Sequence, residues 1–254
     1  MFVAITRAVS PAVAACELTH LERAPIDVDR ARAQHDAYER ALVEAGGRVH
    51  RLETSPEMPD SVFVEDIAVV FPDVAVVTRP GAASRRGEVA AVAAALKPFR
   101  PLHEIQSPGT IDGGDVLVAG HRVFVGVSTR TNEAAIAQLR QMLGPRGYTV
   151  CATKVTGCLH LKSAVTALDE STLLVNRAWI EPAVLGGFTL VDVDPAEPSA
   201  ANALRLADRI IFPSAFPRTA RRIEARGLRV VTVDADELAK AEGAVTCCSL
   251  IIGE

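Results

Sequence analysis

Residues 115–152 read DVLVAGHRVFVGVSTRTNEAAIAQLRQMLGPRGYTVCA and carry one complete supersecondary unit. The apolar runs Asp115–Ala119 and Arg122–Val127 flank a Gly-His turn, which is typical of two paired strands. Asn132–Leu143 is predicted to be a helix, which the following Gly-Pro ends. Tyr148–Ala152 is predicted to return as a strand. The stretch therefore predicts the order strand, strand, helix, strand.

The same layout recurs before and after this unit. Val62–Phe71 and Val74–Thr78 are predicted strands, the alanine-rich Ser84–Leu96 is a predicted helix stopped by Pro98, and Pro101–Ile105 is a predicted return strand. Two further units are predicted from strands at Ser163–Leu168, Thr172–Val175, Phe188–Val193, Ala203–Leu206, Arg209–Phe212 and Leu228–Val233, and from helices at Pro182–Leu185 and Pro217–Ala225.

The fifth unit is predicted to be shared by the two ends of the chain. Cys248–Ile252 supplies one strand, while Phe2–Thr6, Asp27–Ala45 and Arg48–Leu52 supply a strand, a helix and a strand. Joining the ends leaves no exposed sheet edge, as in circular repeat folds. We therefore predict an α/β protein of five strand-strand-helix-strand units, closed by the chain termini, in a single domain spanning residues 1–254.

Polar residues recur along this apolar chain at a near-constant interval. Asp66, Asp112, His160, Asn202 and Cys247 are separated by steps of 46, 48, 42 and 45 residues. A fixed period of this size marks a repeated structural unit. Reactive side chains at matching repeat positions are therefore expected to converge on one axis.

Composition limits the class of protein. With 254 residues, 49% hydrophobic and 23% charged, the chain can bury a substantial core. A net charge of -4 argues against nucleic acid as a partner, and no apolar run reaches the roughly 18–20 residues of a membrane helix. Val13-Ala14-Ala15 faintly resembles a signal-peptide site, but Arg7 and Pro11 interrupt it, so a cytoplasmic location is expected.

The cysteine pattern argues against a disulfide framework or a metal site. The five cysteines are odd in number, and two are adjacent. Cys-x-x-Cys, His-Glu-x-x-His and phosphate-binding Gly-x-x-x-x-Gly-Lys-Ser/Thr patterns are absent from the sequence. Neither a structural zinc site nor a nucleotide-hydrolysing loop is expected.

Cys247 and His160 are candidates for nucleophilic catalysis. A thiol needs an ionisable state and a proton shuttle to act as a nucleophile, and His160 is the histidine in phase with the repeat. The alternative is that Cys247 is a small buried hydrophobe and His160 is structural. Cys248 follows at the start of a predicted strand, so by alternation it is expected to face the opposite side and pack in the core.

Acidic and basic side chains suggest how a ligand would be recognised. Glu65 and Asp66 are adjacent carboxylates in an apolar run, where they either mark a strand end or receive a planar cation such as a guanidinium. Asp112 either forms a turn or orients the imidazole of the next unit. Arg85 and Arg130 follow the second strands of their units and could hold a carboxylate at the rim, although most arginines are solvated.

Five motifs, in order along nearly the whole chain, carry a family resemblance. They are DSVFVED (residues 60–66), RPGAASRR (79–86), DGGD (112–115), LHLKS (159–163) and TCCS (246–249). Together they closely resemble the dimethylarginine dimethylaminohydrolase family. That resemblance implies a five-bladed α/β propeller of the guanidino-group-modifying enzymes. It also implies hydrolysis of Nω-methylated L-arginine to L-citrulline and a methylamine, with no metal, nucleotide or redox cofactor.

The resemblance also implies the site residues. Cys247 would be the nucleophile, His160 the general acid and base, and Asp112 the partner that orients His160. The substrate-binding residues would be Glu65 and Asp66 for the guanidinium with Asp60 nearby, Arg85 and Arg130 for the carboxylate, and the backbones of Leu18 and Ala241 for the amino-acid end. Leu18 lies in the long segment Ala8–Pro25, which is expected to be a lid or binding loop.

Other functions stay open at this point. An arginine deiminase or citrulline hydrolase would share these motifs, although the usual inserted helical domain of deiminases finds no room here. An amidinotransferase is usually longer, and a non-catalytic binding factor would leave Cys247, His160 and the acidic pair without a joint purpose. The expected partner is a small-molecule substrate, not nucleic acid or a membrane, and a homodimer is left open.

Overall fold

The computed structural model describes residues 1–54 and 56–253. Its strands form five three-stranded sheets. The strands are β1 Phe2–Arg7, β2 Gly47–Leu52, β3 Ala68–Val70, β4 Ala75–Val77, β5 Leu102–Glu104, β6 Val116–Ala119, β7 Arg122–Val127, β8 Thr149–Lys154, β9 Val165–Ala167, β10 Thr172–Val175, β11 Thr189–Asp192, β12 Leu204–Leu206, β13 Arg209–Pro213, β14 Arg229–Val233 and β15 Leu250–Gly253.

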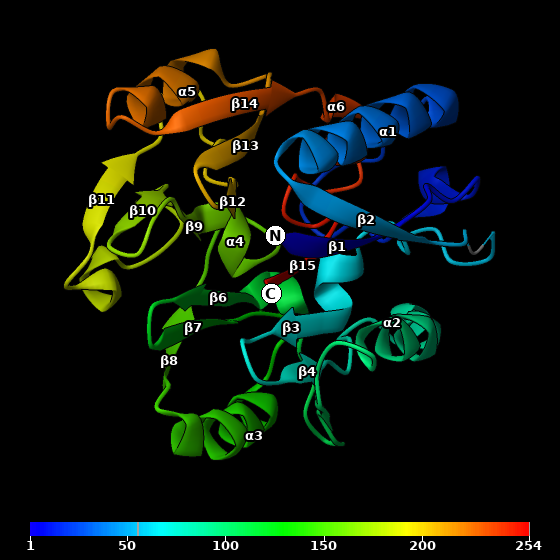
Figure 1. Cartoon of the computed structure of the whole chain (residues 1–254), viewed down its shortest axis with the longest axis vertical. Coiled ribbons are helices and arrows are strands. Elements are labelled where there is room, and N and C mark those ends of the chain that lie inside the picture. The colour runs from blue at the N-terminus through cyan, green and yellow to red at the C-terminus, as the bar shows by residue number, and fades with distance from the viewer. Residues whose placement is uncertain (55, 254) are drawn as a thin grey trace.

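Helices connect the strands, and the longer helices lie at the periphery (Figure 1). The α-helices are α1 Val28–Glu44, α2 Val89–Leu96, α3 Glu133–Leu143, α4 Leu161–Ala164, α5 Pro217–Glu224 and α6 Asp236–Ala239. The 3-10 helices are η1 Val13–Ala15, η2 Val64–Ile67, η3 Ala83–Glu88, η4 Gly113–Asp115, η5 Gly144–Arg146 and η6 Pro182–Leu185. None of the helices in the described part of the chain has the length and hydropathy needed to cross a membrane.

Every sheet has the same topology. In the unit that contains β6, β7 and β8, the first pair is antiparallel and the second pair is parallel. A parallel pair needs a crossover connection, which α3 supplies here. The side chain of Asn132 accepts a hydrogen bond from the backbone N–H of Ala135 at 3.0 Å and so caps the start of α3. The predicted order strand, strand, helix, strand is confirmed.

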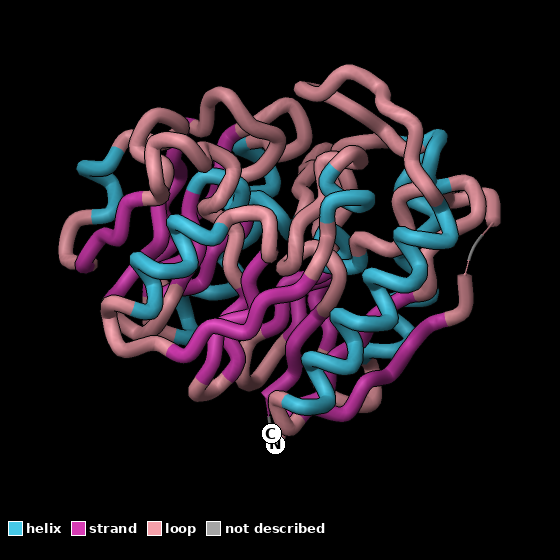
Figure 2. The backbone as a smooth tube through the Cα atoms, turned by 90° about the horizontal axis from the view of Figure 1, so that it is seen from above, coloured by secondary structure: helices cyan, strands magenta, loops and turns pink. Residues whose placement is uncertain are grey.

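The two chain ends complete the fifth unit, as predicted. β15 pairs antiparallel with β1, with Val3 opposite Ile252, and β1 pairs parallel with β2. Figure 1 shows the five units around a common centre, and Figure 2 shows that the two termini lie together on one face of the molecule. Hydrogen bonds between the ends therefore close the ring of units.

Short helical turns replace the beginnings of several predicted strands. Val62–Phe71 was expected to be one strand, but Val64–Ile67 forms η2 and only Ala68–Val70 extends. In the third unit, Ser163 lies in α4. A strand would send adjacent side chains to opposite faces, whereas a tight helical turn lets neighbours such as Glu65 and Asp66 both reach the axis.

The hydrophobic core is divided among the spaces between units. One cluster joins Val69 and Val76 of one sheet to Val123 of the next and to Ile136 and Leu139 of α3. Each helix therefore buries its apolar face against two neighbouring units. This arrangement leaves the centre of the ring free for the polar side chains that the turns carry.

Candidate active site

Turns from four units bring ionisable side chains together near the centre of the ring. Asp66 lies on η2, Asp112 precedes η4 and His160 precedes α4. The Nε2 atom of His160 lies 3.1 Å from Oδ2 of Asp112, and its Nδ1 atom lies 3.8 Å from Oδ1 of Asp66. Cys247, in the turn before β15, lines the same cavity as His160 and Asp66. Residues spaced by the sequence period therefore meet in space.

Gly114 makes this close approach possible. Its backbone N–H donates to Oδ1 of Asp66 at 3.0 Å. A Cβ atom at Gly114 would lie 2.6 Å from Nδ1 of His160 and 2.9 Å from Oδ1 of Asp66, closer than carbon can pack. The second glycine of the Asp-Gly-Gly-Asp motif is therefore required because no larger residue fits between His160 and Asp66. This reason adds to the turn that the sequence indicated.

The surroundings of His160 favour its charged form. Burial lowers its pKa, but the charge of Asp66 and the hydrogen bond to Asp112, with the further charge of Asp115, outweigh burial and raise the pKa to about 9. The imidazole is therefore protonated at neutral pH and can donate a proton to a departing group.

Asp115 belongs to the site, although the sequence predicted for it only a place at the start of a strand. It is fully buried, accepts from the backbone N–H of Leu161 at 3.0 Å and from the hydroxyl of Ser128 at 2.6 Å. The first of these contacts holds the beginning of α4, directly after His160. Its position in the Asp-Gly-Gly-Asp motif was the available signal.

Arg85 is buried, in contrast to the rim position expected for it. Only 4% of it is exposed. Its Nη1 atom donates to Asp66 at 2.5 Å, its Nη2 atom lies 2.8 Å from Oε2 of Glu88, and the backbone carbonyls of Asp60 and Phe63 accept further hydrogen bonds. A rigid guanidinium with five donors suits such a site, where an uncompensated carboxylate would be costly. The side chain still borders the cavity.

Glu65 is held by Lys162 and Thr246, for which no role was predicted from the sequence. Lys162 donates to its Oε1 atom at 2.5 Å, and the hydroxyl of Thr246 donates to its Oε2 atom at 2.7 Å. The backbone N–H of Glu65 also donates to the carbonyl of Cys247 at 3.1 Å. Both partners lie inside the motifs LHLKS and TCCS, and a buried carboxylate requires partners of this kind.

Cys247 is a half-buried thiol beside two carboxylates. Burial and the charges of Glu65 and Asp66 raise its pKa well above the usual value. Cys248 packs in the hydrophobic core, with 4% exposed. The core position predicted for Cys248 is therefore confirmed. The reason given for it, alternation of side chains along a strand, is wrong, because Cys247 and Cys248 lie in a turn and β15 begins only at Leu250.

The remaining predicted binding residues lie around the same cavity, with one exception. Asp60 borders it, accepts from the backbone N–H of Glu17 at 3.2 Å and has a pKa raised by burial. Arg130 and Ala241 also border it. Leu18 does not line this cavity, and its side chain packs against the core instead. Its neighbour Glu17 lines the cavity.

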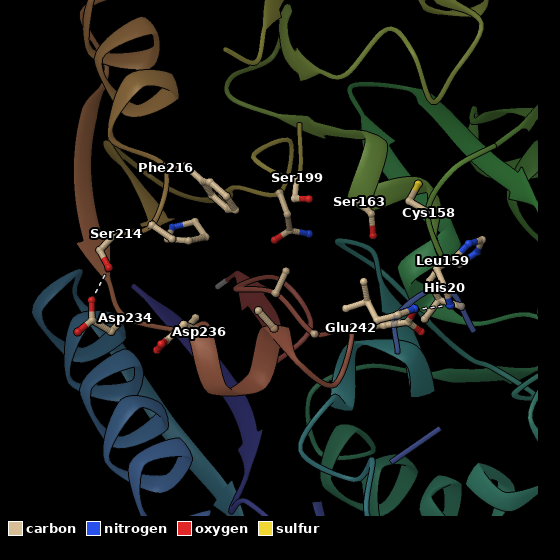
Figure 3. A pocket seen from close by; sticks show the side chains of 18 of the residues that line it. His20, Cys158, Leu159, Ser163, Ser199, Ser214, Phe216, Asp234, Asp236 and Glu242 are labelled. Carbon is tan, nitrogen blue, oxygen red and sulfur yellow. Dashed lines mark hydrogen bonds between the residues drawn. The ribbon is translucent and has the colours of Figure 1, made fainter. Parts of the chain in front are cut away.

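The cavity at Cys247 is small. It measures about 20 Å³, room for roughly one water molecule, whereas small-molecule sites occupy roughly 300–1,000 Å³. A larger cavity of about 640 Å³ lies beside it and shares Leu159, Glu242 and Gly243 with it (Figure 3). Binding of an amino acid at Cys247 therefore requires these shared walls or the nearby loop to move.

Glu242 holds the nearby loop, which is part of the segment Ala8–Pro25, beside the cavity at Cys247. Its carboxylate accepts hydrogen bonds from the backbone N–H groups of Thr19, His20 and Leu21 at 2.9, 2.6 and 2.8 Å. Its φ of 59° is in the left-handed region, which residues other than glycine rarely adopt. Figure 3 shows Glu242 next to His20 at one end of the larger cavity. Glu242 therefore acts as a latch that holds the segment predicted to be a lid or binding loop.

We expect Glu242→Gln to loosen this loop. The amide keeps one acceptor oxygen where the carboxylate offers two charged ones, so at least one of the three contacts is lost. Cleavage by trypsin after Arg23, within the loop, should become several-fold faster. The matched control is Glu224→Gln on the exposed end of α5, which should leave the cleavage rate unchanged. Equal cleavage rates in the two variants would contradict the latch.

The central cluster also has the ligand types of a metal site. Asp66, Asp112 and His160 each offer an atom within 4.8 Å of the others among the described residues. Arg85 and Gly114 already donate to the carboxylate of Asp66, and His160 contacts Asp112. These contacts fit a cluster that transfers protons, in which the positive charge of Arg85 compensates the negative charge of Asp66.

Comparison with known proteins gives one consistent family. Residues 19–184 match the family model described as N,N dimethylarginine dimethylhydrolase, eukaryotic. An N(G),N(G)-dimethylarginine dimethylaminohydrolase of Streptomyces coelicolor is 40% identical over 99% of this chain and 97% of its own. The Pseudomonas aeruginosa protein of the same name is 34% identical over 88% of this chain and 89% of its own.

Solved structures agree. The Pseudomonas aeruginosa enzyme, as a cysteine-to-serine mutant complexed with citrulline, superposes with a TM-score of 0.94 at 32% identity, over 99% of this chain and all of the other. A histidine-to-glycine dimethylarginine dimethylaminohydrolase adduct with S-methyl-L-thiocitrulline superposes with a TM-score of 0.93 over 99% of this chain and all of the other. The N-terminal domain of the cyanobacterial arginine dihydrolase ArgZ, at 17% identity, shares the fold with a TM-score of 0.88 over 100% of this chain and 98% of the other.

Proposed function

The chain belongs to the dimethylarginine dimethylaminohydrolase family, and from that premise we propose that it hydrolyses Nω-methylated L-arginine to L-citrulline and methylamine or dimethylamine. One observation carries the proposal. Cys247, His160, Asp66 and Arg130 line one small cavity, and the backbone N–H of Glu65 donates to the carbonyl of Cys247. The site therefore offers a nucleophile, a proton donor, carboxylates for a cation and a cation for a carboxylate.

Substrate binding is proposed to activate the thiol. In the free protein, burial and two carboxylates keep the pKa of Cys247 high, so the thiol is protonated. A guanidinium placed between Cys247 and the carboxylates of Glu65 and Asp66 would neutralise their repulsion and favour the thiolate, whose proton leaves to solvent. His160 cannot take that proton, because it is already an imidazolium at neutral pH.

The chemical steps follow from these protonation states. The thiolate of Cys247 attacks the guanidinium carbon, and His160 gives its proton to the departing methylamine, leaving a thiouronium adduct on sulfur. The neutral imidazole of His160 then takes a proton from water, which attacks the same carbon. Collapse of that intermediate breaks the carbon–sulfur bond and releases L-citrulline, and the sulfur of Cys247 takes up the proton of the intermediate's hydroxyl group, which regenerates the thiol. Asp112 holds the imidazole in place throughout through its contact with Nε2.

The proposed activity is tested by product release from a panel of guanidines. Purified protein is incubated with asymmetric dimethylarginine, monomethylarginine, arginine and citrulline, and citrulline, amine and ammonia are measured. We expect citrulline together with an equal amount of methylamine or dimethylamine from the methylated substrates. Ammonia from arginine or citrulline, with no turnover of methylated arginines, would assign the chain to a deiminase or citrulline hydrolase activity instead.

Agmatine tests how the amino-acid end is recognised. It carries the guanidinium but no carboxylate, so it cannot pair with Arg130. Arg130→Met should reduce kcat/KM for monomethylarginine by about 30- to 5,000-fold, since losing a charge-assisted contact costs about 2–5 kcal/mol. The same change should reduce the low activity towards the arginine analogue agmatine by a much smaller factor, which reports the loss of the 3.8 Å ion pair between Nη1 of Arg130 and Oδ2 of Asp112. Comparable efficiencies for agmatine and monomethylarginine in the unaltered protein would contradict the proposed contact.

Three further features stay predictions. We propose that residues 1–254 act as one catalytic domain, that the substrate is the principal partner, with a homodimer left open, and that the enzyme works in the cytoplasm without a metal or redox cofactor. Gel filtration and localisation of a tagged protein address assembly and compartment.

A further inference from the structure

Asn202 is the member of the sequence period that the proposed reaction leaves without a role. It lies in the segment before β12 at the repeat position shared with Asp66, Asp112, His160 and Cys247. Its side chain is 4% exposed and borders the larger cavity. A buried amide requires hydrogen-bond partners, and those of Asn202 come from the segments that carry the nucleophile and the proton donor.

The amide of Asn202 joins these two segments. Its Oδ1 atom accepts from the backbone N–H of Thr246 at 3.1 Å, and its Nδ2 atom donates to the carbonyl of Lys162 at 3.1 Å and to the hydroxyl of Thr246 at 2.9 Å. A backbone N–H only donates and a carbonyl only accepts, so these partners fix which side-chain atom is oxygen. Thr246 precedes Cys247, and Lys162 follows His160 by two residues.

This arrangement sets the direction of the Thr246 hydroxyl. Because Nδ2 of Asn202 donates to the hydroxyl oxygen, the single hydroxyl proton is left to point at Oε2 of Glu65, 2.7 Å away. The other oxygen of Glu65 accepts from Lys162, whose backbone is also held by Asn202. Both contacts that fix the Glu65 carboxylate therefore depend on groups that Asn202 holds.

We infer that Asn202 is a positioning residue that acts through Thr246 and Lys162. It holds the carboxylate of Glu65 in place, and it fixes the position of the Cys247 turn relative to the His160 turn. This inference rests on the proposed function, because Glu65 is the carboxylate assigned there to the guanidinium. Orientation of the guanidinium carbon towards sulfur is a large part of the rate, so a small displacement of Glu65 is costly.

Asn202→Asp is the decisive change, because it keeps the shape and the acceptor for the Thr246 N–H. It replaces Nδ2 with an oxygen, which repels the Lys162 carbonyl and draws the Thr246 hydroxyl proton away from Glu65. We expect kcat/KM for monomethylarginine to fall by about 10- to 100-fold, mostly in kcat. Thr246→Val should cause a similar loss, and Thr246→Ser, which keeps the hydroxyl, should stay within about threefold of the wild type.

A matched control separates positioning from stability. Asn176 is also a buried amide that donates to a backbone carbonyl, that of Pro198, and accepts from a backbone N–H, that of Ala178, but it lines neither cavity. Asn176→Asp should leave kcat/KM at the wild-type level, even where urea unfolding shows that it destabilises the protein as much as Asn202→Asp does.

The double variant Asn202→Asp/Thr246→Val tests the route of action. If Asn202 acts through Thr246, the double variant should be no slower than the slower single variant, whereas independent losses would multiply. Multiplied losses, or wild-type kcat/KM in Asn202→Asp, would overturn the inference while leaving the proposed function intact. If Asn202→Asp does not fold, the comparison of Thr246→Val with Thr246→Ser tests the inference instead. Wild-type kcat/KM in Thr246→Val would then overturn the inference. Failure of the wild-type protein to release citrulline from methylarginines would overturn the proposed function and this inference together.

Discussion

Cys247→Ser is expected to reduce citrulline release from monomethylarginine by about 10,000-fold or more, because a serine hydroxyl does not ionise in a site that already raises the thiol pKa. Binding should persist, since Glu65, Asp66 and Arg130 are untouched. Steady-state turnover gives the loss, and isothermal titration with monomethylarginine measures the retained affinity. This is the largest single-residue effect that we expect.

The neighbouring thiol supplies the control. Cys248 is buried in the core, where it contacts the carbonyl of Ala244 at 3.6 Å. Cys248→Ser should lower the free energy of unfolding by about 1–2 kcal/mol, as for a modest polar change in a core, while kcat stays within a few-fold of the wild type. Mass spectrometry after rapid acid quenching should place the substrate-derived adduct on the peptide at Cys247. An adduct on Cys248 would refute the assignment of the nucleophile.

His160→Gln is expected to reduce kcat by about 100- to 10,000-fold, since both departure of the amine and attack of water lose their proton carrier. The glutamine amide can still contact Asp112, so the fold around α4 should be kept. The pH dependence gives a second readout. His160 has a pKa of about 9 and donates from its protonated form, so wild-type kcat/KM should fall as the pH rises through about 9.

The variant should lack this alkaline fall. Deprotonation of an imidazolium can no longer occur, so the residual kcat/KM of His160→Gln should stay level or rise with pH as the thiol ionises. Stopped-flow mixing at pH 7 and pH 10, with initial rates on monomethylarginine, distinguishes the two profiles. Near wild-type turnover by His160→Gln across neutral pH would contradict the proposed role.

Much of the architecture could be predicted because its causes are local. Turn residues, runs of apolar residues and helix-ending prolines lie within each unit, so the order of elements follows from short windows of sequence. The pairing of the first strand with the last could also be predicted, because the unit left incomplete at one end of the chain lacks the strands that the other end supplies. The positions of Asp66, Asp112, His160 and Cys247 followed from the period alone.

The internal contacts of the site could not be predicted in the same way. The expectation for Arg85 considered only its place after a strand, whereas its environment is set by Glu88, Asp66 and two backbone carbonyls that the closed ring brings around it. The strand predicted at Val62–Phe71 failed for a related reason. Near the axis the apolar pattern continues, but the chain must turn to direct Glu65 and Asp66 to one side.

The spacing of Asp66, Asp112, His160 and Cys247 was enough to predict that they meet near the centre of the ring, because it is close to the length of one structural unit. The contacts that each of them makes there depend on the closed fold. Lys162 and Glu65 are 97 residues apart, Thr246 and Glu65 are 181 apart, and Glu242 and the N–H of Thr19 are 223 apart. Charged side chains near the centre pair with whichever partners the closed ring of units brings close to them. The protonation states of His160 and Cys247 follow from the charges that surround them there.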